Sequence, residues 1–100
     1  MQQRIENRLH LTVEGADLTG AKKPELYVKQ GMRTFFQYEP EILSGSELLV
    51  TVPYEDAMQL SRTTCMLQLA FTDAEGNPVA TEPEEVSVGA LLKEMGYDPS

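Results

Sequence analysis

Cys65 and His10 are the residues whose types could supply a catalytic nucleophile and its base, since a thiol beside an imidazole supports covalent catalysis. His10 alternates with the apolar Leu9 and Leu11, which places it on the polar face of a predicted strand. Cys65 lies beside Met66 in an apolar segment and is expected on an inward face. The two side chains are therefore predicted to face different ways, with Cys65 a buried core thiol and His10 exposed.

Asp73, Glu75 and Asn77 alternate in the way that the first ligands of a calcium-binding loop do. Such a loop needs glycine at its sixth position. Here Gly76 stands at the fourth position, counted from Asp73. We therefore predict a hairpin turn at this segment.

A second acidic run, Glu82, Glu84 and Glu85 around Pro83, could hold a cation or act as an acid/base pair. Clustered carboxylates beside a proline are more typical of a solvated segment. The sequence contains no G-x-S-x-G, H-E-x-x-H or C-x-x-C motif, and its turn glycines are too far apart for a phosphate-binding loop. We expect no enzymatic activity, no cofactor, no metal and no small-molecule substrate.

The composition is that of a single globular domain spanning residues 1–100. Hydrophobic residues at 41% and charged residues at 24% are close to globular averages, and a chain of this length builds one core without disulfides. Its longest apolar run is three residues, too short for a transmembrane helix or a signal peptide. We expect synthesis in the cytoplasm and no membrane partner.

The charge is concentrated in the second half of the chain. Residues 1–50 carry six Lys/Arg and seven Asp/Glu, a net −1, and residues 51–100 carry two and nine, a net −7, which together give −8. An acidic surface repels phosphate backbones, so nucleic-acid binding is not expected. The charge either keeps the protein soluble or faces a basic partner surface, and the sequence leaves both open.

Alternating apolar residues predict most of the strands. The alternation covers residues 9–13, 26–28, 33–39 and 48–52. Gly31 supplies the hairpin turn between the second and third of these strands. Phe36 and Tyr38 share one face of the third strand and Phe35 points the other way, before Pro40 ends it.

Residues 63–72 form the longest predicted strand. Its two faces carry Cys65, Leu67, Leu69 and Phe71 on one side and Met66, Gln68 and Ala70 on the other. Both faces are largely apolar, which predicts a central strand covered on two sides. Just before it, Tyr54, Ala57 and Met58 stand at i, i+3 and i+4, which predicts a helical turn over residues 54–60.

A C-terminal helix is predicted over about residues 88–95, with Ser87 as its N-cap and Gly96 as its stop. Its apolar stripe is formed by Val88, Leu91, Leu92 and Met95. A helix of about eight residues is unstable alone in water and has to dock. These four residues are the candidate interaction site, and two alternatives stay open: packing on their own domain or in a groove of a neighbouring subunit.

Short strands at turn-marked intervals predict a mainly β fold, an antiparallel β-sandwich of five to seven strands with a short C-terminal helix. A short additional strand is expected at Val86. The expected core consists of Leu11, Val13, Leu26, Val28, Phe36, Tyr38, Val50, Val52, Leu67, Leu69 and Phe71.

Two stretches, residues 16–31 (ADLTGAKKPELYVKQG) and 48–76 (LLVTVPYEDAMQLSRTTCMLQLAFTDAEG), resemble the N-terminal immunoglobulin-like domain of the baseplate upper protein family of phages. The acidic-acidic-small-apolar turn of that domain is matched by Glu55, Asp56, Ala57 and Met58. The closing LLKEMGYDP, residues 91–99, is similar to the ends of short proteins encoded in prophages.

The resemblance implies an immunoglobulin-like sandwich that serves as a structural or assembly component of a phage or prophage particle, in the tail or baseplate. It also implies a place in the virion, after assembly in the bacterial cytoplasm, and partners that are other phage structural proteins or further copies of this chain. The alternative function is a small cytoplasmic binding module that docks a cellular protein or peptide at a sheet edge.

Overall fold

The computed structural model describes residues 7–32 and 34–95, and this part of the chain is mainly β. The strands are β1 (Asn7–Thr12), β2 (Lys22–Gln30), β3 (Thr34–Tyr38), β4 (Glu41–Ile42), β5 (Glu47–Val52), β6 (Thr64–Thr72), β7 (Pro78–Ala80) and β8 (Glu84–Ser87). The helices are α1 (Tyr54–Gln59) and α2 (Val88–Glu94).

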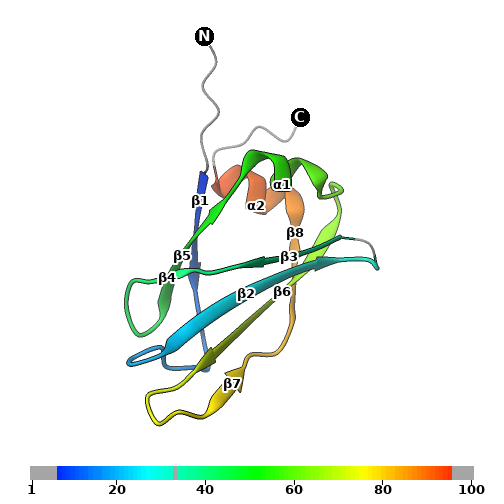
Figure 1. The fold of residues 1–100 in the computed structure, drawn as a ribbon. Coiled ribbons are helices and arrows are strands. Elements are labelled where there is room, and N and C mark those ends of the chain that lie inside the picture. The colour runs from blue at the N-terminus through cyan, green and yellow to red at the C-terminus, as the bar shows by residue number, and fades with distance from the viewer. Residues whose placement is uncertain (1–6, 33, 96–100) are drawn as a thin grey trace.

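The strands form two antiparallel sheets. Sheet A has the order β1-β5-β4, and sheet B has the order β3-β2-β6, with β7 and β8 both pairing with β6. This order corresponds to sheets B-E-D and C′-C-F-G of an immunoglobulin-like sandwich, with β7 and β8 together in the place of strand G. The helices α1 and α2 lie at one end of the sandwich, and the β6–β7 hairpin lies at the other (Figure 1). The predicted fold class, an antiparallel β-sandwich with a short C-terminal helix, is confirmed, although the described residues form eight strands where five to seven were expected.

Pro40 marks the point where the chain passes from sheet B to sheet A. β3 ends at Tyr38, and β4 begins at Glu41 in the other sheet. Proline has no N–H with which to continue the ladder, and Pro40 is buried at the crossing. The predicted end of the strand is confirmed, whereas β4 was not predicted because two residues are too few to show a period.

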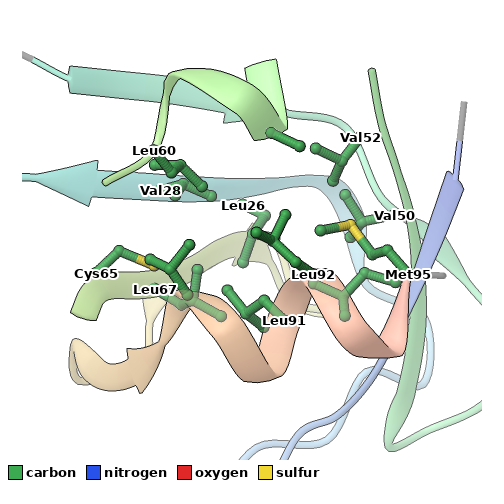
Figure 2. Packing of buried hydrophobic residues seen from close by; sticks show 13 residues of the cluster. Leu26, Val28, Val50, Val52, Leu60, Cys65, Leu67, Leu91, Leu92 and Met95 are labelled. Atoms are coloured by element: carbon green, nitrogen blue, oxygen red, sulfur yellow. The ribbon is translucent and has the colours of Figure 1, made fainter. Parts of the chain in front are cut away.

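The core lies between the sheets and continues beneath the two helices (Figure 2). A larger cluster joins inward residues of β1, β2, β5 and β6 to α1 and α2, and a smaller cluster forms around Leu18, Leu48, Leu69 and Phe71. Among the predicted core residues, the buried ones are Leu26, Val28, Val50, Val52, Leu67, Leu69 and Phe71. The others are half-buried against these clusters: Leu11, Val13, Phe36 and Tyr38.

Helix α2 packs on its own domain. The Ser87 hydroxyl accepts the Ala90 N–H at 3.3 Å, so the predicted N-cap is confirmed, while the predicted stop at Gly96 lies outside the described residues. The candidate interaction residues are buried in the larger core cluster: Val88, Leu91, Leu92 and Met95. The first of the two open alternatives is therefore the one seen in the structure, and these side chains offer no free surface.

The prediction that β6 is covered on both faces is wrong. β6 is central in sheet B, and Leu67 faces the core, but its neighbour Met66 is 36% exposed on the other face. The reason is the placement of the helices, which close one end of the sandwich and leave the outer face of sheet B open (Figure 1).

The helical turn predicted over residues 54–60 is confirmed as α1. Ala57 and the following Leu60 are buried, whereas Tyr54 and Met58 are exposed. α1 has six residues, fewer than two turns, and lies at the end of the sandwich (Figure 1). Ala57 is therefore the residue of this helix that is buried in the core.

Candidate interaction surface

The outer face of sheet B carries three apolar side chains from three neighbouring strands: Tyr27 on β2, Phe35 on β3 and Met66 on β6. We call these three residues the outer patch. Phe35 is 57% exposed and Met66 is 36% exposed, and Tyr27 is half-buried between them. Their chain neighbours point into the sandwich, as the alternation of a strand requires. The predicted opposite orientations of Phe35 and Phe36 are confirmed.

The strand register brings the outer patch together. Lys29 is the pairing partner of both Phe35 and Met66, so Phe35, Lys29 and Met66 form one row across sheet B. The row continues from Met66 to Glu85 on β8. Residues that pair across strands have their side chains in contact range. The rings of Tyr27 and Phe35 lie diagonally across this row, with centroids 5.7 Å apart and a tilt of 31°.

Polar side chains hold the outer patch in place. Glu25 accepts the Tyr27 hydroxyl at 2.5 Å through Oε1 and the Gln37 amide at 3.0 Å through Oε2. The hydrogen bond to Glu25 raises the pKa of the Tyr27 phenol, and burial and the negative charge of Glu25 add to this effect. On the other side, the Gln68 amide donates to the Thr81 carbonyl at 2.8 Å.

The surface around the outer patch is hollowed. The hollow has a volume of about 500 Å³ and is lined by Tyr27, Lys29, Phe35, Met66, Gln68 and Pro83. Aromatic residues and methionine are the residue types enriched in protein–protein interfaces. The lining is mainly apolar and aromatic, which suits contact with an apolar surface.

The residues considered for catalysis lie apart from the outer patch. His10 Nε2 lies 3.2 Å from Glu47 Oε2 on sheet A, and both side chains are well exposed. Cys65 is buried in the larger core cluster, and burial raises the pKa of its thiol. The structure confirms that one faces solvent and the other the core, so no Cys–His pair forms.

The acidic segments are explained by local structure. Asp73 Oδ1 accepts the N–H groups of Glu75 and Asn77 at 2.9 and 2.8 Å, so this carboxylate organises the predicted hairpin turn. Glu85 accepts the Thr64 hydroxyl at 3.0 Å and is exposed. Within residues 7–32 and 34–95, no group of three or more His, Cys, Asp or Glu residues is placed to hold a metal ion.

Sequence reasoning placed the interaction site in α2 and missed the outer patch. The signal was present, because Phe35 was predicted to point away from Phe36 and Met66 away from Leu67. An apolar outer face was interpreted as burial under a second layer. No element within residues 7–32 and 34–95 forms a second layer there, so Phe35 and Met66 are exposed.

Comparisons with protein-family models, curated proteins and solved structures give no match. None of the helices in the described part of the chain is long and apolar enough to cross a membrane.

Proposed function

We propose that this protein is a non-enzymatic assembly domain that docks on another protein through the outer patch. The resemblance of residues 16–31 and 48–76 to a baseplate domain gives the proposed setting, the tail or baseplate of a phage or prophage particle. The observation that supports docking is the cluster of Tyr27, Phe35 and Met66, open to solvent on a well-paired sheet.

The outer patch is suited to binding because it is rigid before a partner arrives. Its residues project from paired strands, and the Tyr27 hydroxyl is already held by Glu25. The backbone of the paired strands and the Tyr27 side chain therefore need little further ordering on binding, which favours affinity for a given contact area. Large side chains at the centre of an interface carry most of its binding energy.

The proposed partner is a different structural protein of the same particle. Each copy of this chain carries a net charge of −8, so two copies repel each other. A partner with an apolar surface would contact Phe35 and Met66, with an acidic group placed to reach Lys29 between them and a basic group placed to reach Glu85 at the end of the row.

The test begins with particles purified from the source strain after prophage induction, in which mass spectrometry should detect this chain. A Phe35→Ser, Met66→Ser double variant should be lost from the particles while its circular dichroism and melting temperature stay close to those of the unchanged protein. Met32→Ser is the matched control, because Met32 is fully exposed at the β2–β3 turn and does not line the hollow. Absence of the unchanged chain from particles would contradict the phage setting, and retention of the double variant would contradict docking through the outer patch.

The alternative is a cytoplasmic module that binds a cellular protein at a sheet edge. It is also non-enzymatic, but it would not be part of a phage particle. The same experiment separates the two, because a cytoplasmic module would stay with the cell extract when particles are removed.

A further inference from the structure

A second candidate site lies on the side of the sandwich where β1 is the edge strand of sheet A. β1 pairs with β5, and no other described strand pairs with it. The edge of sheet B on this side is formed by β7 and β8. Residues from both edges line one cavity of about 430 Å³, which we call the edge groove.

The floor of the edge groove is apolar. It is formed by Leu11, Val13, Leu26, Leu48, Leu67, Leu69 and Val79. These side chains come from both sheets, so the groove reaches into the space between them. Leu11 and Val13 remain half-buried on the groove side, whereas Leu48 is fully buried beneath them.

A β-bulge opens the groove on the sheet B side. Ala80 pairs with Ala70 and Glu84 pairs with Leu67, so residues 81–83 lie opposite only residues 68 and 69. One extra residue interrupts the strand and separates β7 from β8. Thr81 anchors the bulge, because its hydroxyl accepts the Leu69 N–H at 3.0 Å and its own N–H donates to the Leu69 carbonyl at 2.8 Å.

The charged residues that line the edge groove are all acidic: Glu14, Glu82 and Glu84. They stand on both sides of the opening, Glu14 just beyond β1 and the other two at the bulge. No lysine or arginine is among the lining residues. A ligand that fits both the floor and the rim therefore has to combine apolar side chains with positive charge.

We propose that the edge groove accepts an extended segment of a partner protein, which adds to β1 as a further strand of sheet A. In an added strand alternate side chains point to one face, so apolar residues at every second position enter the groove. Lysine or arginine on the same face, two positions before or after these apolar residues, would reach Glu14, Glu82 and Glu84, with their aliphatic stems lying along the apolar floor. β1 has six residues, which sets the length of the segment at about six.

The proposal is tested with synthetic peptides and isotope-labelled protein. The probe is acetyl-Lys-Ser-Val-Ser-Val-Ser-Lys-amide, in which the lysines and valines share one face of the strand, and the matched peptide carries glutamate in place of both lysines. Titration to millimolar peptide should shift the amide resonances of β1, and the lysine peptide should bind at least tenfold more tightly than the glutamate peptide. The difference should shrink as salt is added, because exposed charge pairs are screened.

Variants of the protein test whether the peptide binds in the edge groove. A Glu14→Gln, Glu82→Gln, Glu84→Gln triple variant should weaken binding of the lysine peptide about tenfold, since both lysines lose their exposed acidic partners and each such pair contributes modestly. Glu85→Gln is the matched control, because Glu85 pairs with Met66 on the outer face, and it should leave binding unchanged. Phe35→Ser should also leave it unchanged, so failure here and failure of the outer-patch proposal are distinguishable. The absence of β1 shifts at millimolar peptide, or equal binding of both peptides, would overturn the proposal.

Discussion

Gln30 and Ser61 exchange two hydrogen bonds: the Ser61 N–H donates to Gln30 Oε1 at 2.7 Å, and Gln30 Nε2 donates to the Ser61 carbonyl at 2.9 Å. The same Nε2 donates to the Thr64 carbonyl at 3.0 Å. One side-chain amide at the end of β2 thereby holds the connection between α1 and β6. In the larger core cluster, Leu60 and Cys65 flank this connection, so its position matters to packing.

Replacing Gln30 with alanine should lower the free energy of unfolding by about 1 kcal/mol, because these hydrogen bonds are exposed and each contributes modestly. Amide exchange at Ser61 should become faster. Gln30→Glu keeps an acceptor for the Ser61 N–H but loses the donor, so it should protect Ser61 better than alanine does. Equal exchange rates at Ser61 in both variants would show that this amide does not hold the connection.

Thr81→Val should lower the free energy of unfolding by about 1–3 kcal/mol. Valine has the shape of threonine but leaves the half-buried Leu69 N–H without the hydroxyl acceptor that it now has at 3.0 Å. Thr81→Ser retains the hydroxyl and should cost clearly less. Urea unfolding of the unchanged protein and the two variants measures these differences. If the valine variant is as stable as the serine variant, the Thr81 hydroxyl does not anchor the bulge.

Leu92→Ala should lower the free energy of unfolding by about 2–5 kcal/mol, the usual range for a buried leucine that leaves a cavity. Leu92 is fully buried in α2, and the helix should loosen with it. Leu43 is 45% exposed, so Leu43→Ala is a matched control with a much smaller expected loss. Sedimentation should show no change of oligomeric state for either variant. A loss of association in Leu92→Ala without a loss of stability would instead assign α2 to a partner.

The pKa of Tyr27 should fall when Glu25 is replaced with glutamine. The hydrogen bond to Glu25 favours the neutral phenol, so it raises the pKa above the ordinary value of 10.0. A raised folded-state pKa means that this contribution to stability is complete below pH 10.0 and is lost as the pH rises through the raised pKa. Nuclear magnetic resonance titration of the tyrosine rings measures the change, with Tyr27→Phe to assign the signal. An unchanged titration in Glu25→Gln would contradict the role of this contact.

Local features of the sequence predicted most of the strands and the start of α2. Period-two alternation identified the inward faces of β2, β5 and β6, and Ser87 identified the start of α2. Gly31 adopts a positive φ of 62° at the predicted turn. These features depend on neighbours in the chain, which the sequence displays directly.

The features that were missed depend on contacts between distant segments. Leu18 lies in a loop without a period, yet it is 1% exposed because its N–H donates to the Gly45 carbonyl at 2.8 Å and its side chain reaches the smaller core cluster. Met66 is apolar in pattern but 36% exposed, because it lies on the outer face of sheet B, away from the core. Alternation shows which face a residue occupies, and only tertiary packing decides whether that face is covered.

The bulge at residues 81–83 also allows Val79 and Val86 to face the same side of the sheet. Val79 faces inward opposite Phe71, and Val86 faces inward opposite Cys65, but the two valines are seven positions apart and their partners six. In an unbroken strand an odd spacing would turn one valine to solvent. Deleting Glu82 alone makes the spacing even, so a continuous strand could keep both valines inside. The length of this segment thus shapes the surface of the molecule independently of the fold beneath it.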